Sequence, residues 1–145
     1  MSKRLAVCGS RTLSDERVKI ILLETIEAEG ITEVVTHAEP EGVCEVARDL
    51  CRERAIPLKL HFLNFKYRRG AFEHRSKDVF ADCDCSVFIW DGKSKGCHNE
   101  KILADKMGIP YTFHALDVSP FKHSVGFEID AEWGQELPVE FPEPL

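Results

Sequence analysis

Short apolar runs alternate with amphipathic runs along the chain up to residue 114. A short apolar run bounded by turn residues is typical of a strand buried on both faces, and apolar residues three or four positions apart are typical of a helix that packs on one face. The apolar runs predict strands at residues 5–8, 33–37, 57–63, 85–90 and 110–114. The spaced runs predict helices between the N-cap Ser14 and the stop at Gly30 and over residues 43–54, 71–81 and 96–107, with a loop at 64–70.

Strands that alternate with helices predict an α/β fold with one parallel sheet covered on both faces. Right-handed crossovers restrict the five strands to a single doubly wound, Rossmann-like sheet, for which we expect the order 3-2-1-4-5. In that order the first and fourth strands are neighbours where the winding reverses. Ligands of such sheets bind outside the carboxyl ends of the strands at this point, so a site is expected there.

Residues 115–145 differ in character and predict an extension to the domain of residues 1–114. The extension carries four of the seven prolines and seven acidic side chains against the single basic residue Lys122. Apolar positions that alternate, such as Val125, Phe127 and Ile129, favour a β-hairpin added to a sheet edge or to a partner subunit. An irregular arm packed on the domain fits the same residues, and both readings stay open.

Composition narrows the classes of function. The 145-residue chain has a net charge of −6, yet residues 1–114 are balanced, with 18 basic and 18 acidic side chains. A neutral domain with an acidic tail argues against general nucleic-acid binding. No apolar run reaches the roughly 18 residues of a membrane helix, and the N-terminus has no signal-peptide pattern. We therefore expect a cytoplasmic protein whose six cysteines are thiols.

A glycine-rich turn at residues 91–96 joins the fourth predicted strand to the last predicted helix. Backbone N–H groups of such a turn, and the dipole of the helix that follows, favour a bound phosphate. Gly9-Ser10-Arg11 leaves the first strand at the same crevice, and this coincidence predicts a site between the two turns. Glu100 falls in the first turn of the predicted helix, where a carboxylate either serves chemistry or interacts with the helix dipole.

Four motifs together give a family resemblance over residues 4–114. They are Val7-Cys8-Gly9-Ser10-Arg11, His37 with Gly42, Gly70 with Arg75-Ser76, and Trp90-Asp91-Gly92-Lys93-Ser94-Lys95-Gly96. With these motifs the chain resembles the SLOG superfamily of Rossmann-like nucleotide-binding proteins, and within it the YspA-like branch. The resemblance implies a module that senses or sequesters a nucleotide-derived molecule. The alternative is an enzyme like the distantly similar LOG phosphoribohydrolases, which cleave the N-glycosidic bond of nucleoside 5′-monophosphates.

The resemblance also implies roles for single residues. Glu100 stands where LOG-type enzymes carry their catalytic glutamate, and it would stabilise or attack the anomeric carbon of the ribose, while Arg75 would position the phosphate or the ribose. Ser76 replaces the usual Asn, and Cys97 replaces the usual Thr. No metal or other cofactor is implied. The implied nucleotide- and phosphate-binding residues are Gly9, Ser10, Arg11, Gly42, Asp91, Gly92, Lys93, Ser94, Gly96 and Cys97.

The turn after the second strand departs most from the family pattern of His-Gly-Gly-Ala-x-Gly-Ala-Asp. Here it reads His37-Ala-Glu-Pro-Glu-Gly-Val-Cys44, so two glycines are lost and Glu39 and Glu41 have entered. Either carboxylate would repel a phosphate lying near this loop. We therefore expect part of the inherited site to be rebuilt for another ligand or lost, which favours a binding module over an enzyme.

The basic segment at residues 66–69, Lys-Tyr-Arg-Arg, lies next to the expected site. It is either a lid that clamps phosphates and stacks a base on Tyr67, or a solvated charged loop. Together with Lys93 and Lys95 it keeps a nucleic-acid-binding hypothesis open, although the neutral domain argues against it.

Four further residues invite chemical readings. Cys97 at the start of a helix, beside His98, is a nucleophile or a core residue. Cys83 and Cys85 have a spacing that favours core positions over metal ligation.

The remaining partner hypotheses are a homodimer, which the family resemblance implies, and an interaction protein that acts through its C-terminal extension.

Overall fold

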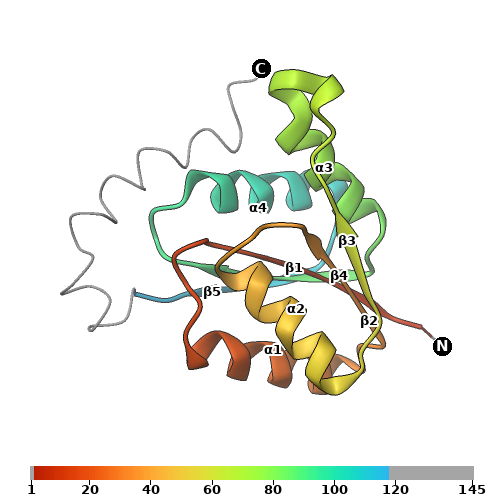
Figure 1. Cartoon of the computed structure of the whole chain (residues 1–145), viewed down its shortest axis with the longest axis vertical. Helices are drawn as coiled ribbons and strands as arrows, with labels where there is room; N and C mark the ends of the chain where they lie inside the picture. The colour runs from red at the N-terminus through yellow and green to blue at the C-terminus, as the bar shows by residue number, and fades with distance from the viewer. Residues whose placement is uncertain (1, 118–145) are drawn as a thin grey trace.

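Strands and helices alternate along the chain in the order that the hydrophobic pattern predicts (Figure 1). The computed structural model describes residues 2–117. The strands are β1 (Arg4–Gly9), β2 (Glu33–His37), β3 (Leu58–His61), β4 (Cys85–Trp90) and β5 (Tyr111–Ala115). The helices are α1 (Glu16–Glu29), α2 (Val43–Arg54), α3 (Ala71–Ala81) and α4 (Lys95–Met107), and a 3₁₀ helix, η1 (Phe65–Gly70), precedes α3.

The five strands form one parallel sheet in the order β3-β2-β1-β4-β5, which confirms the predicted doubly wound, Rossmann-like topology. The central strand β1 pairs with β2 on one side and β4 on the other, so Leu5 lies between Val34 and Cys85. Because all strands point the same way, the loops that follow them meet along one edge of the sheet. This edge holds every candidate site described below.

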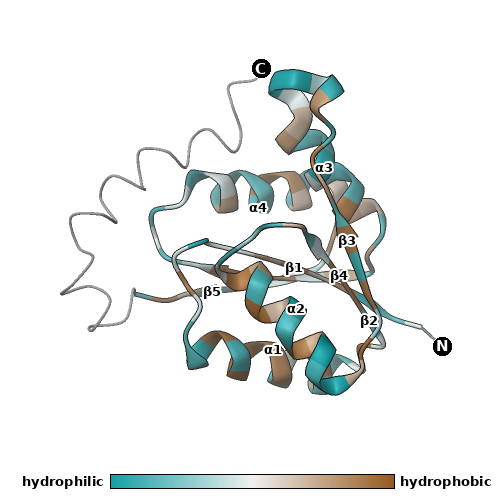
Figure 2. Cartoon of the chain, viewed as in Figure 1, coloured by the Kyte–Doolittle hydropathy of each residue, from teal (hydrophilic) through white to brown (hydrophobic). Residues whose placement is uncertain are grey.

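The sheet separates two hydrophobic cores, and helices cover both faces (Figure 1). Leu5 and Val7 of β1 face α1 and α2, whereas Ala6 and Cys8 of the same strand face α3 and α4. Strand β4 is apolar along most of its length because it is buried on both faces. Figure 2 shows that the helices carry both hydrophobic and hydrophilic residues along their length, as expected of helices that pack on one face.

The helix ends correct several predicted boundaries. The N-cap of α1 is Asp15 rather than Ser14, since the Asp15 carboxylate accepts a hydrogen bond from the N–H of Arg17 at 2.9 Å. Gly30 ends α1 in the left-handed conformation, as predicted. The expected loop at 64–70 is largely the 3₁₀ helix η1. The expected placement of Glu100 in a first turn is wrong, because α4 begins at Lys95 and its first turn contains no acidic residue.

The last strand runs one residue past the predicted domain boundary at residue 114. The remainder of the predicted extension, including its hairpin or irregular arm, lies outside the described residues from 118 onward. Within residues 2–117, none of the helices combines the length and the apolar character needed to cross a bilayer.

Candidate functional site

The loops that follow β1 and β4 lie together, as the strand order requires. The Ser10 hydroxyl accepts a hydrogen bond from the Asp91 N–H at 3.0 Å, and the Ser10 N–H donates to the carbonyl of Ile89 at 3.0 Å. The Thr12 hydroxyl donates to the Asp91 carboxylate at 2.6 Å. These contacts bury Ser10 and Asp91, so both side chains act first as a clamp between the two loops.

The turn after β4 satisfies many of its own donors. One carboxylate oxygen of Asp91 accepts hydrogen bonds from the N–H groups of Lys93 and Ser94, both at 2.8 Å. The Ser94 hydroxyl caps α4 by accepting from the N–H of Cys97 at 3.3 Å. Internal oxygens therefore take three N–H groups of this turn and helix start that a phosphate could otherwise have used.

Gly9 and Gly42 serve close packing between loops. A Cβ on Gly9 would lie 2.5 Å from the side chain of Val43. Gly42 has a φ of +84°, and a Cβ there would lie 2.4 Å from the Cα of Arg11. The missing side chain of Gly42 thus lets the loop after β2 press against the loop after β1, and this contact fixes the backbone from which Arg11 projects. Gly92 also has a positive φ, +86°, but is surrounded by open space.

Glu100 belongs to a buried polar cluster between the sheet and helices α3 and α4. Its carboxylate lies 2.9 Å from Nε2 of His37 and 3.1 Å from the hydroxyl of Ser76, which lies 3.1 Å from the same Nε2. Glu100 is only 8% exposed, and His37 and Ser76 are more deeply buried. The three side chains tie the end of β2 to both helices on this face of the sheet.

The charge of this cluster is shared between a cation and an anion. Burial acts to lower the pKa of His37, but the adjacent Glu100 carboxylate and a hydrogen bond with Cys44 outweigh it and raise that pKa to about 10. At neutral pH His37 is therefore protonated and paired, which makes it an anchor rather than a general base. Burial and the nearby carboxylate both raise the pKa of the Cys8 thiol well above its ordinary value.

The same cluster contains the best donor set for a metal within residues 2–117. The ligand atoms of Cys8, His37 and Glu100 lie within 4.8 Å of one another. A thiolate, an imidazole and a carboxylate are ligands that zinc accepts. In this structure, however, the imidazole and the carboxylate are at hydrogen-bonding distance from each other, and the hydrogen bonds of the cluster account for its shape without an ion.

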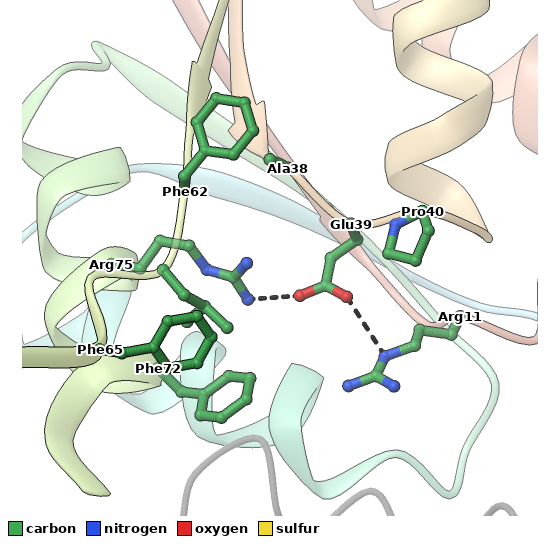
Figure 3. Close-up of a pocket in the computed structure, with 9 residues that line it drawn as sticks. Arg11, Ala38, Glu39, Pro40, Phe62, Phe65, Phe72 and Arg75 are labelled. Carbon is green, nitrogen blue, oxygen red and sulfur yellow. Dashed lines mark hydrogen bonds and ion pairs between the residues drawn. The ribbon is translucent and has the colours of Figure 1, made fainter. Parts of the chain in front are cut away.

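A second charged group consists of Arg11, Glu39 and Arg75 (Figure 3). They come from the loop after β1, the loop after β2 and helix α3, respectively. One oxygen of the Glu39 carboxylate pairs with the terminal guanidinium nitrogen of Arg75, and the other lies 3.4 Å from Nε of Arg11. Arg48 of α2 donates a hydrogen bond to the backbone carbonyl of Glu39 and so stabilises the loop after β2. Glu39 thus bridges the two arginines through its two carboxylate oxygens.

Glu39 remains ionised in this setting. Burial acts to raise its pKa, but the two arginines hold that pKa below its ordinary value of 4.5. Arg75 has the larger effect, and Arg11 the smaller. Protonated His37 adds to the same effect, so the buried cluster and the arginine pair are electrostatically connected. Two neighbouring cations therefore reduce, without removing, the expected repulsion between Glu39 and a phosphate.

The arginine pair borders a pocket of about 340 Å³ at the ends of β1, β2 and β3 (Figure 3). Its aromatic wall consists of Phe62, Phe65 and Phe72; Arg75 lies on the same side of the pocket, and Arg11 lies across from it (Figure 3). Phe62 and Phe65 are 70% and 74% exposed, which is unusual for phenylalanine and marks an open apolar surface. Phe72 lies under the guanidinium of Arg75 at 5.6 Å. The lining residues are Arg11, Ala38, Glu39, Pro40, Phe62, Leu63, Phe65, Phe72 and Arg75.

The structure brings together only part of the predicted site set. Arg11 and Arg75 line the pocket. Glu100 lies in the buried cluster, and the remaining implied residues form the clamped loops and tight packing already described. Tyr67 stacks on His74 with ring centroids 3.8 Å apart, so its ring face is already engaged.

The cysteine hypotheses have structural outcomes as well. Cys97 is buried, and the ring of its neighbour His98 stacks near Trp90, 5.9 Å away. Cys83 is also buried and donates to the carbonyl of Phe80. These thiols occupy core positions.

Sequence reasoning missed the two phenylalanines Phe62 and Phe65 and the bridging role of Glu39. The available signal was weak. Phe62-Leu63-Asn64-Phe65 is an apolar stretch in a segment that otherwise predicts a strand end and a loop. Glu39 departs from the family pattern, but only the fold places it between Arg11 and Arg75.

A scan against protein-family models and a search of the curated proteins gave no match to this chain.

Proposed function

We propose that this protein binds a nucleotide-derived small molecule in the pocket at the ends of β1, β2 and β3, as a sensing or sequestering module. The observation that carries the proposal is the presence of an open aromatic wall and two arginines in one pocket. A nucleotide needs both, because its base stacks on aromatic rings and its phosphate binds guanidinium groups.

The pocket is displaced from the crevice between the first and fourth strands that the topology favours. The loops at that crevice hold each other through Ser10 and Asp91, and Asp91 takes the N–H groups of the turn. Arg11, from the loop after β1, and Arg75, from α3, offer charge instead. The proposed ligand therefore lies one strand further along the same edge of the sheet.

Binding without cleavage is the form of the proposal that the geometry favours. A glycosidase carboxylate must reach the anomeric carbon, yet Glu100 accepts hydrogen bonds from His37 and Ser76 in a buried cluster. The phosphoribohydrolase alternative would need this cluster to open.

The test incubates the 145-residue chain with nucleoside monophosphates, cyclic nucleotides and NAD-derived compounds, and records the melting temperature and any released base. A ligand that binds the native state raises the melting temperature by an amount that grows with the logarithm of its concentration over its Kd. We expect stabilisation without release of base, and its loss in Arg75→Met. Base release that disappears in Glu100→Gln would instead establish the hydrolase. No response from any compound would contradict the nucleotide proposal.

A further inference from the structure

The arginine pair already holds an anion, and that anion belongs to the protein. The Glu39 carboxylate uses one oxygen for Arg75 and the other for Arg11, so it occupies the position between the two guanidinium groups (Figure 3). A phosphate bound by both arginines needs the same position. The two anions cannot share it, because like charges at contact distance repel strongly in a partly buried site.

We propose that Glu39 is an internal competitor that a ligand phosphate displaces, and that a terminal phosphomonoester displaces it better than a phosphodiester does. This inference rests on the proposed function and adds the class of ligand. Glu39 sets the free energy that any phosphate ligand must supply to bind, and Arg11 and Arg75 are the groups exchanged between it and the ligand.

The selectivity follows from charge and from the number of acceptors. A phosphomonoester carries a charge of about −1.5 to −2 at pH 7 and three strong acceptor oxygens. A diester carries one negative charge, as does the carboxylate that it would replace. Only the monoester therefore gains charge on exchange with Glu39, and the diester exchanges one monoanion for another.

Arg75 supplies an independent reason to expect exchange. Its side chain is 6% exposed, and its buried Nε has no hydrogen-bond partner within the part of the chain that the structure describes. A buried donor without a partner is unfavourable, and Glu39 does not satisfy it. An anion with a third oxygen could accept from Nε as well as from the terminal nitrogens, which a carboxylate cannot do in the observed pairing.

The structure also gives a matched control. Glu41 is two residues away in the same loop and carries the same charge, but it is exposed and forms no ion pair within residues 2–117. Glu39→Gln and Glu41→Gln change the net charge equally, so a difference between them reports the position of Glu39 rather than the overall field of the protein.

The experiment is isothermal titration calorimetry of the wild type, Glu39→Gln and Glu41→Gln with three probes: adenosine 5′-monophosphate, adenosine 3′,5′-cyclic monophosphate and adenosine. We expect wild type to prefer the monophosphate. Glu39→Gln should tighten binding of both phosphates by about ten- to a hundredfold, because the competitor for a charged hydrogen bond is removed, and should leave the ratio of the two affinities unchanged, because the free energy of displacing Glu39 is the same for either ligand. Glu41→Gln should change either affinity by less than about threefold because its charge is exposed to screening.

The outcomes separate this inference from the proposed function. If Glu39→Gln binds each phosphate no more tightly than the wild type does, Glu39 is no competitor. The inference is then overturned, while nucleotide binding stands. If no variant binds any probe, both are overturned. Glu39→Asp provides a second reading that keeps the charge and so protects against a folding defect. Its shorter side chain cannot bridge both arginines, so it should bind the cyclic diester more tightly than the wild type does, and equal affinity would overturn the inference.

Discussion

Two carboxylates in this protein are each held by basic side chains, and they differ in what surrounds them. Glu100 lies between β2, α3 and α4, where His37 and Ser76 complete its hydrogen bonds away from solvent. Glu39 lies between Arg11 and Arg75 at the border of an open pocket. The ion pair of Glu100 lies in the protein interior and stabilises the fold. The ion pairs of Glu39 border a pocket that a ligand can enter.

The difference teaches that a motif position does not by itself identify the working residue. The family resemblance assigns catalysis to Glu100, and the same resemblance marks Glu39 as a departure. The structure gives Glu100 the contacts of a structural ion pair and Glu39 the contacts of a group poised at a ligand site. Four experiments test this contrast.

Removal of Glu100 should have the largest effect on stability. Glu100→Leu leaves His37 buried without its carboxylate, and the loss of one partner of a buried pair costs about 3–5 kcal/mol. Urea unfolding at pH 7 measures this change, and Glu24→Leu on the exposed side of α1 should change the free energy of unfolding by no more than about 0.5 kcal/mol. If Glu100→Leu left the stability unchanged but abolished ligand binding, Glu100 would be part of the ligand site instead of a structural ion pair.

Substitution of Gly42 tests the packing that places Arg11. Gly42→Ala and Gly92→Ala both strain a positive φ, at a cost of about 1 kcal/mol, but only Gly42 meets a backbone atom at 2.4 Å. We expect Gly42→Ala to be more destabilising by about 1–3 kcal/mol, because the two loops must move apart. Thermal unfolding of both variants measures the difference. Equal melting temperatures would show that the loops are not held in contact.

Truncation of Phe62 tests the open pocket. Phe62→Ala should weaken nucleotide binding by about 1–3 kcal/mol if a base stacks on it, with little effect on stability because the ring is largely exposed. Ile20→Ala removes another exposed apolar side chain, from α1 and away from the pocket, and serves as the control. Calorimetric affinities that fall equally in both variants would contradict the role of the aromatic wall.

The pH dependence of stability tests the closed cluster. The folded pKa of His37 is raised from 6.5 to about 10, so folding retains a proton that the unfolded chain loses within this range. The stability contributed by the charged imidazole is complete below pH 6.5 and is lost as the pH rises toward 10, by at most about 1.4 kcal/mol per pH unit. Urea titrations at pH 6.5 and pH 8 should show a larger loss in the wild type than in His37→Gln, in which only buried thiols with a raised pKa, such as Cys8, still contribute. An identical slope in both would mean that His37 is neutral.

Some of these features could be predicted from local sequence. The alternation of buried strands with amphipathic helices gave the element order, and right-handed crossovers then left one topology, because both depend on short-range patterns and general chirality. Caps were less predictable. Ser14 and Asp15 are both good N-cap residues, and the choice depends on which of them reaches the N–H of the first turn.

The chain by itself determined the doubly wound sheet, the edge at which its loops gather, and the residue types available there. Only the tertiary structure decided which of those residues share a pocket. Arg11, Glu39 and Arg75 come from three separate segments, and the space left by Gly42 brings the first two loops together. The aromatic wall, likewise, arises where the end of β3 turns into η1 and α3. Contacts between distant segments depend on side-chain packing and loop approach, which no periodicity in the sequence encodes.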